Sequence, residues 1–273
     1  MRLRNCALIT LVLIWTVGTV AAEPLGDPDI PDGQRIVYSY DTTYKSSIFL
    51  KDIKEMEEVR RSVNTIEHYE EEGKRFYRVR DRGMRANGYT FNHVTILERG
   101  GYLKPISFRA SDSNPEGRII REMFARFDDE ALVYPEDTYP IFSSITAIRG
   151  LDFKPGSRAE VFLWLAPTEI YRIFIDVEAM ETIVTAAGTF ECYRLDLKPD
   201  IRAILPIGVF LASLLQPFLP EYYFWYSTEP SHPLVKFKGS LGGVGASYTV
   251  VELKEIEWGR GEPDPADAAM MEP

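Results

Sequence analysis

The sequence contains few cysteines and histidines, two residue types that often act in catalysis or bind metals. It has two cysteines and three histidines in 273 residues. His68, His93 and His232 lack the three- or four-residue spacing of a helical zinc motif. Cys192 matches no cysteine-hydrolase signature, and no Gly-x-Ser-x-Gly motif occurs. We therefore predict no catalytic residue, no metal site and no cofactor, and we expect a protein that is not an enzyme.

Basic residues are also in the minority. The chain has 31 of them against 41 acidic residues, and its net charge is −10 at pH 7. An acidic surface repels nucleic acid and anionic membranes, so we expect no nucleic-acid partner. The glycine-rich stretch 239–245 precedes strand-like residues rather than a helix, which predicts a hairpin loop and not a phosphate loop.

Long apolar runs are rare, and the first of them has the features of a targeting segment. Two arginines in the first four residues precede an apolar stretch at 6–20, and small residues follow at 20–22. The stretch is short for a membrane span, so we predict a signal peptide at 1–22 and no transmembrane anchor after its cleavage. This indicates secretion across the inner membrane to the periplasm or cell envelope. Cys192 would then be the single remaining cysteine.

Turn-forming residues mark the two ends of the remaining chain. Proline, glycine and aspartate at 23–33 predict a flexible leader, and the proline-containing stretch 259–273 predicts a disordered tail. Between them, 34–258 is expected to form a single β domain.

Short runs of β-branched and aromatic residues, separated by turn residues, fill that domain. Hairpins are predicted at 62–82, turning near Gly73, and at 89–110, turning at 100–101. The pattern predicts a mainly β fold, a curved antiparallel sheet that forms an open or partly closed barrel or roll. A helical turn is expected at 140–149. Further strands are predicted at 35–40, 119–127, 130–134, 159–165, 170–179, 181–185, 190–198, 222–227, 234–238 and 247–258.

The segment 201–219 departs from the β pattern because it is apolar on nearly every side. Pro206 and Pro217 bracket a predicted short apolar helix that would cover the open face or mouth of the sheet. It could instead line or gate an apolar ligand cavity, or contact a bilayer, since its side chains must be shielded from water. The side chains of this segment with which we expect a ligand to make contact are Ile207, Phe210, Leu211, Leu214, Leu215 and Phe218.

Two further groups of side chains are candidate ligand contacts. Tyr223 and Trp225 share one face of an aromatic strand, and a second layer is needed to cover that face. Arg78, Arg80 and Arg82 alternate along a predicted strand and so share a face as well. The arginines could pair with glutamates of the neighbouring strand, or they could bind an anionic headgroup or glycan.

Three stretches of the sequence resemble the bacterial exported family known as domain of unknown function 3108. They are 148–156, 184–193 and 224–239, the last running from Phe-Trp-Tyr-Ser to His-Pro-Leu-Val-Lys-Phe-Lys-Gly. The resemblance implies a periplasmic or envelope protein with a curved antiparallel sheet. More remotely, it implies an architecture like that of the lipoprotein carriers LolA and LolB, whose half-barrels hold acyl chains. The family supplies no catalytic residues that could be transferred to this chain.

Three functions remain open from the sequence. The leading hypothesis is an exported, non-enzymatic protein that binds an apolar or amphipathic molecule such as a lipid or acyl chain. The second is a structural or assembly factor that binds another envelope protein, through an exposed edge strand for example. The weakest is a carbohydrate-active enzyme, because carboxylates are plentiful and their pairing in space cannot be seen in a sequence.

Overall fold

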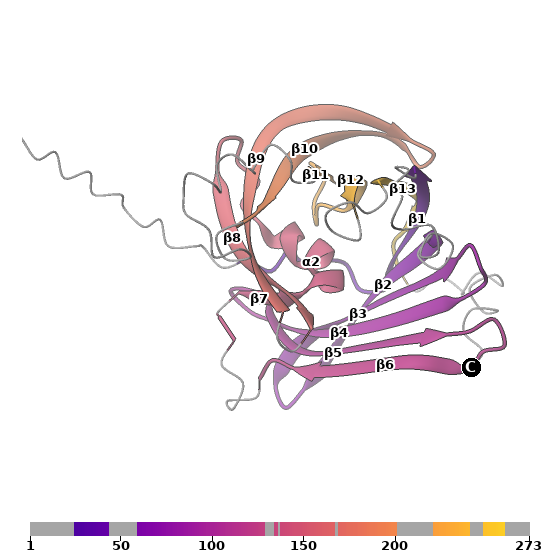
Figure 1. Cartoon of the computed structure of the whole chain (residues 1–273). Helices are drawn as coiled ribbons and strands as arrows, with labels where there is room; N and C mark the ends of the chain where they lie inside the picture. Colours follow the sequence, from indigo (N-terminus) through magenta and orange to yellow (C-terminus); the bar gives the residue numbers. More distant parts are fainter. Residues whose placement is uncertain are drawn as a thin grey trace, which may run out of the picture.

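The structure of the protein, a computed structural model, describes residues 25–43, 59–128, 134–135, 137–166, 169–200, 221–240 and 248–259. These residues form one 13-stranded sheet with a short α-helix, α2 (Ile141–Ala147), and a 3₁₀ turn (Ile148–Gly150). The mainly β fold with a curved, unclosed antiparallel sheet is therefore confirmed (Figure 1).

The sheet is ordered β6-β5-β4-β3-β2-β1-β13-β12-β11-β10-β9-β8-β7. All neighbours are antiparallel except the pair of β7 and β8. The strands are β1 (Gln34–Thr43), β2 (Val59–Glu71), β3 (Lys74–Arg85), β4 (Thr90–Arg99), β5 (Lys104–Ser113), β6 (Ile119–Arg126), β7 (Thr138–Pro140), β8 (Arg158–Ala166), β9 (Glu169–Thr185), β10 (Gly188–Pro199), β11 (Tyr222–Ser227), β12 (Leu234–Ser240) and β13 (Tyr248–Glu257).

The hairpin of β2 and β3 shows how the sequence sets the register. Glu72 and Gly73 both have positive φ, 51° and 74°, which is the backbone of a two-residue type I′ turn. The turn fixes the pairing of His68 with Tyr77 and of Ile66 with Val79. Side chains of these pairs point to the same side of the sheet, and all but His68 are fully or nearly fully buried.

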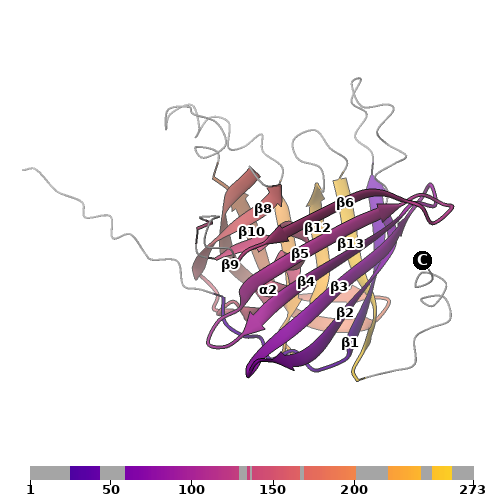
Figure 2. The ribbon, with the colours of Figure 1, turned by 90° about the horizontal axis from the view of Figure 1, so that it is seen from below.

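The sheet curls so far that its two terminal strands approach each other without pairing (Figures 1 and 2). Aromatic rings fill the seam between them. Trp164 of β8 meets Phe108 of β5 edge to face at 5.8 Å between ring centroids, and Phe127 at 5.5 Å. The hydroxyl of Tyr139 donates to the carbonyl of Leu103 across the same seam at 2.9 Å. Side-chain packing therefore joins the two ends where backbone pairing does not.

Helix α2 lies inside the curl (Figure 1), as the helical turn expected at 140–149 anticipated. It follows Pro140, and the hydroxyl of Tyr226 on β11 donates to the carbonyl of Ile145 at 3.0 Å. Ser143 and Ser144 bond back to carbonyls of the preceding turn, so the polar atoms of this short helix are satisfied where they are buried.

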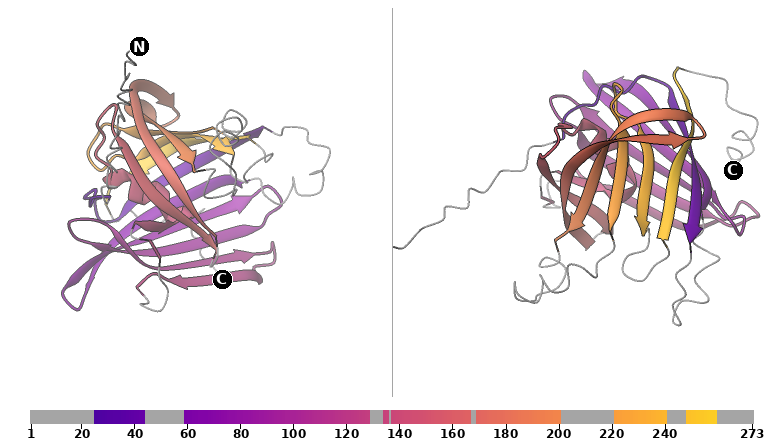
Figure 3. Two further views of the ribbon diagram at one scale, coloured as in Figure 1. Left: turned by 60° about the vertical axis from the view of Figure 1, so that its left-hand side comes forward. Right: turned by 90° about the horizontal axis from the view of Figure 1, so that it is seen from above.

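The hairpin of β9 and β10 extends beyond the barrel-like body and arches over the outer side of β11 to β13 (Figure 3). The predicted division of β9 into 170–179 and 181–185 is wrong, because both runs belong to one strand of 17 residues. A bulge between Arg194 and Leu195 of β10 lets the pair bend without ending.

Candidate functional site: two ends of the inner face

One end of the curled sheet is covered by its own N-terminal segment, Leu25–Gly33, which we call the strap. We expected this segment to be a flexible leader, and for the strap that expectation is wrong. Leu25 and Ile30 are 1% and 0% exposed, and the amide of Gly26 donates to the carbonyl of Gly150 at 2.8 Å. Burial of two large aliphatic side chains contributes roughly 3–6 kcal/mol, enough to hold a segment with several breaks in regular structure.

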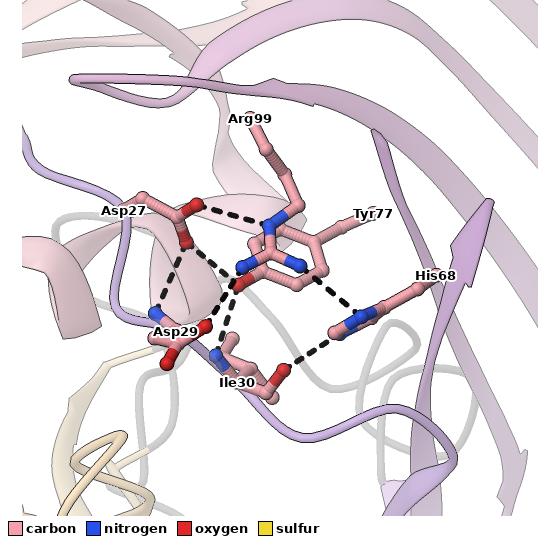
Figure 4. A network of polar contacts seen from close by, with 6 residues as sticks. All are labelled: Asp27, Asp29, Ile30, His68, Tyr77 and Arg99. Carbon is pink, nitrogen blue, oxygen red and sulfur yellow. Dashed lines mark hydrogen bonds and ion pairs between the residues drawn. The ribbon is translucent and has the colours of Figure 1, made fainter. Parts of the chain in front are cut away.

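A network of charged groups holds the strap in place (Figure 4). The guanidinium of Arg99 donates to Asp27 and to Asp29, each at 2.9 Å, and its Cζ atom lies 4.3 Å from the ring centre of Tyr77. The Tyr77 hydroxyl donates to Asp27 at 2.6 Å. Burial alone would raise the pKa of Asp27, but bonds from Tyr77 and Arg99 hold that pKa below its ordinary value. His68 bonds to the carbonyl of Ile30 at 2.6 Å.

A buried arginine lies at this same end, which we call the strap end. Arg149 is 3% exposed and donates to the carbonyl of Ser231 at 2.5 Å and to the amide oxygen of Gln34 at 2.7 Å. Burial lowers the pKa of Arg149 to about 10, so the side chain still carries its charge at neutral pH. Its donors are used to tie the 3₁₀ turn to β1 and to the turn before β12, which is a structural role.

The other end of the inner face carries polar groups that the strap, Leu25–Gly33, does not cover. Tyr40, Ser62, Asn64, Asp81 and His93 form what we call the polar inner cluster. They come from four neighbouring strands, and Asp81 of β3 pairs directly with both Asn64 and His93. Ser62 and His93 are buried, whereas the other three members are partly exposed. The cluster therefore combines polar groups that are shielded from water with side chains that are in part exposed on the inner face.

Hydrogen bonds link three members of the cluster into a chain. The hydroxyls of Tyr40 and Ser62 are 2.9 Å apart, and Ser62 also bonds to the carboxyl group of Asp81. Because Ser62 has one proton, donation to Asp81 requires that it accept a bond from Tyr40. Burial raises the pKa of Asp81 to about 7, although the hydrogen bond from Ser62 acts to lower it. Asp81 thus exchanges its proton near neutral pH.

His93 borders this chain and is held neutral. Burial, reinforced by the charges of Arg85 and Arg121, lowers its pKa to about 4. Its ring lies 4.1 Å from that of Phe142 and 4.9 Å from that of Phe91. The Nδ1 atom of His93 is buried and has no hydrogen-bond partner in the structure. Buried polar atoms of this kind are rare in folded proteins, so His93 has an unused hydrogen-bonding capacity.

Phe142 of α2 lies beside the polar inner cluster, because its ring contacts that of His93. Phe142 is 44% exposed, and Ile141 and Ile145 of the same helix are partly exposed. The same surface therefore offers carboxyl, amide and hydroxyl groups next to aromatic and aliphatic carbon. Such a surface suits a molecule with both a polar and an apolar part. Within the part of the chain that is described, the Ser62 hydroxyl bonds to Tyr40 and Asp81 and not to a histidine, unlike the activated serine of a hydrolase.

The structure does not bring the predicted ligand contacts together. The six predicted contacts of the segment 201–219, from Ile207 to Phe218, and the apolar helix there, lie outside the described residues. Trp225 and Tyr223 are on β11 and face the outer side. Trp225 is 7% exposed and donates to Glu181 of the β9–β10 hairpin at 2.8 Å. Among the described residues, this hairpin supplies the cover over Trp225 that we had expected from the helix.

The arginine row of β3 lies on the side of the strand opposite to Asp81. Arg78 pairs with Glu67 of β2 at 3.2 Å and stacks on Tyr69, so the cross-strand alternative is confirmed for this residue. Arg82 donates to Asn92 at 3.4 Å. Arg80 lies between them on the same face. Four strands, β2, β1, β13 and β12, lie between this row and Trp225 in the sheet order, so the two groups form no common site.

One pattern in the sequence indicates the polar inner cluster, although our predicted ligand contacts did not include it. Along β3, Tyr77, Val79 and Asp81 share a face because side chains alternate in a strand. Tyr77 and Val79 are apolar, which marks that face as the buried one and Asp81 as a carboxyl group within it. The alternating arginines drew attention to the opposite, outer face.

The described residues contain neither a cluster suited to a metal ion nor a helix suited to a membrane crossing. No group of three or more histidine, cysteine, aspartate or glutamate side chains in the described ranges is placed to hold a metal ion. Likewise, none of the helices there has the length and apolar character that a membrane crossing requires.

Comparisons with known proteins give likeness in shape only. No protein-family model and no curated protein matches the chain, so the resemblance to family 3108 and to the Lol carriers stays a prediction. A candidate lipoprotein from Parabacteroides distasonis is 12% identical, with a TM-score of 0.37 over 83% of this chain and 95% of its own.

Two further solved structures are similar to the chain. A β-barrel-like protein of domain of unknown function 1849 from Brucella abortus is 9% identical, with a TM-score of 0.43 over 84% of this chain and 98% of its own. A candidate exported protein with a YmcC-like fold from Bacteroides fragilis is 11% identical, with a TM-score of 0.31 over 86% of this chain and 99% of its own.

Proposed function

We propose that this protein is exported from the cytoplasm and binds an amphipathic molecule on the inner face of its sheet, at the end away from the strap. The observation that carries the proposal is the partial exposure of Tyr40, Asn64 and Asp81 beside the 44% exposed ring of Phe142. The ligand's polar part would lie against the cluster, and its apolar part against α2. The signal-peptide-like segment at 1–22 supports the location.

The structure offers an energetic reason for a ligand at this place. Burial destabilises the ionised form of the Asp81 carboxyl group, which has no charged partner among the described residues. The Nδ1 atom of His93 has no hydrogen-bond partner among them. An unpaired buried polar group costs about 1–3 kcal/mol, which a ligand with matching groups would recover. Covering Phe142 and the two isoleucines of α2 would add an apolar contribution.

Native mass spectrometry and lipid extraction of protein purified without detergent test the proposal. We expect a retained small molecule, and a rise in melting temperature when that class of molecule is added, since a ligand at 100 times its Kd stabilises by about 2.7 kcal/mol. Protein that is empty, with no gain in melting temperature from any lipid class, would contradict the proposal.

A matched pair of variants locates the binding. Phe142→Asp places a charge beside the polar inner cluster, and Phe124→Asp places one on β6, where the side chain is 62% exposed. Both positions are exposed enough to accept a carboxylate without unfolding. We expect loss of the retained molecule in the Phe142 variant and its persistence in the Phe124 variant.

One observation favours a second function, the binding of an extended segment of another envelope protein. Strand β6 is terminal in the described sheet and carries Ile119, Ile120 and Phe124 at 58%, 52% and 62% exposure. A terminal strand with exposed apolar side chains is a template for strand addition. Photo-crosslinking from position 122 in intact cells would show one dominant protein adduct, and its absence would remove this alternative.

A further inference from the structure

The polar inner cluster contains a carboxyl group that the described protein leaves without a cation. Asp81 is partly exposed and bonds to Ser62, and no ion pair to it occurs among the described residues. Its pKa responds to burial and to that one hydrogen bond, and not to any positive charge. The site therefore has a partly exposed carboxyl group that can ionise and that has no cation beside it among the described residues.

The positive groups nearest to the cluster are engaged elsewhere. Arg149, in the 3₁₀ turn that follows α2, is buried and donates to Gln34 and Ser231 at the strap end. Arg85 of β3 pairs with Asp112 of β5 at 3.1 Å. Arg121 of β6 acts with Arg85 on the pKa of His93, but neither acts on that of Asp81.

The remaining groups that face Asp81 are uncharged at neutral pH. Tyr38 and Tyr40 of β1 keep their protons, because burial raises the pKa of both well above 10. His93 of β4 is neutral because its pKa is lowered to about 4. Asn64 and Ser62 of β2 do not titrate. Apart from Arg85, whose charge is paired with Asp112, the groups of these strands that face Asp81 would therefore offer a ligand cation oxygen acceptors and neutral side chains.

From this arrangement we propose that the polar group bound beside Asp81 is a protonated amine, so that the ligand is a cationic amphiphile with a primary ammonium and an apolar chain. An ammonium has three donors, and the Asp81 carboxylate, the Asn64 amide oxygen and the Tyr40 hydroxyl oxygen are acceptors on one face. The rings of Phe142 and His93 adjoin it, and an aromatic face also attracts a cation. The net charge of −10 favours the approach of cations over anions.

Binding would move one proton in a defined direction. Free Asp81 is mostly protonated below its pKa of about 7. A neighbouring ammonium lowers the pKa of a carboxyl group, so Asp81 ionises when the ligand binds and its proton passes to the solvent. The ammonium keeps its own proton. At pH 6.5, uptake of a cationic amphiphile should therefore release a fraction of one proton per ligand.

The inference rests on the proposed function. Three probes of equal chain length distinguish a failure of the amine assignment from a failure of the proposed function. Decylamine, decanol and decanoate are titrated calorimetrically below their micelle concentrations into the whole protein. We expect decylamine to bind at least about tenfold more tightly than decanol, as one charge-assisted hydrogen bond provides, and decanoate to bind most weakly. Binding of all three with no preference, or tightest binding of decanoate, would overturn the amine assignment alone. No binding of any probe would contradict the proposed function itself.

Two isosteric variants assign the preference to one side chain. Asp81→Asn removes the carboxylate inside the curl, and Asp41→Asn makes the same change in charge on an exposed position of β1. We expect the decylamine preference and the proton release, measured in two buffers of different ionisation enthalpy, to disappear in the Asp81 variant and persist in the Asp41 variant. An unchanged preference in the Asp81 variant, which melting curves would show to be folded, would sink the proposal.

Discussion

The two ends of the inner face are built from the same strands but satisfy their polar groups differently. At the strap end, the guanidinium of Arg99 contacts two aspartates, the ring of Tyr77 and His68. Asp27 in turn accepts hydrogen bonds from Arg99 and Tyr77. At the other end, Asp81 has one hydrogen bond and the Nδ1 atom of His93 has none. A polar network that is complete stabilises a fold, whereas one that is incomplete costs free energy unless something else completes it. The difference separates a structural end from an end that is suited to binding.

The largest effect is expected from breaking the strap network. Arg99→Ala leaves Asp27 largely buried without its cation, which should lower the free energy of unfolding by about 3–5 kcal/mol. Arg109→Ala removes an ion pair with Glu122 whose two side chains are 66% and 46% exposed, and should cost less than about 1 kcal/mol. Urea unfolding of both variants measures the difference. Equal losses would mean that the strap is not a stabilising element.

A backbone contact of the strap gives a second, smaller effect. A Cβ atom at Gly150 would lie 1.8 Å from the carbonyl oxygen of Gly26, so the strap must move to accept it. Gly150→Ala should destabilise the fold by about 1–3 kcal/mol, as overpacking does. At Gly101 the added atom meets nothing within 4 Å, and the same substitution should have little effect. Thermal unfolding, with hydrogen exchange at Ile30 as a local readout, tests this pair.

The free carboxyl group at the other end should make stability depend on pH. The folded-state pKa of Asp81 is raised to about 7 from an ordinary value of 3.8. The stability that its protonated form provides is therefore complete below pH 4 and is lost as the pH rises through 7. Asp81→Asn should thus raise the melting temperature by several degrees at pH 8 and change it little at pH 4. A variant that is less stable than the wild type at pH 8 would show that the carboxylate is paired.

His93 should give the smallest effect, with the opposite dependence on pH. Its folded-state pKa is lowered to about 4 from 6.5, so its contribution is present above pH 6.5 and is lost as the pH falls to 4. His93→Phe keeps an aromatic ring between Phe91 and Phe142. The variant should match the wild type at pH 7.5 and lose less stability than it does between pH 6.5 and 4.5. Parallel acid-unfolding curves would contradict this assignment.

The strand pattern was accessible from the sequence because it depends on local signals. Glu72-Gly73 sets a two-residue turn, and alternation along β2 to β5 assigns the buried face. The strap was not accessible, since the residues that bury Leu25 and Ile30 come from distant strands. Proline, glycine and aspartate in that segment are equally typical of a loop and of a pinned irregular segment.

The candidate site was harder to predict than the fold for a related reason. A single strand shows which residues share a face, but not where along the curl that face is covered. Tyr77 and Asp81 lie on the same face of β3, yet one is fully buried beneath the strap and the other is partly exposed. That difference depends on where the strap ends, which is a property of the tertiary structure.

The position at which a photoreactive ligand attaches would show which end of the inner face binds it. A decylamine analogue with a photoreactive diazirine on its chain is bound to the whole protein, irradiated and located by peptide mass spectrometry. We expect adducts on residues around the cluster, such as Tyr40, Asn64 and Phe142. Adducts that fall instead on the strap or on the outer face around Trp225 would contradict the assignment of binding to the end that the strap leaves open.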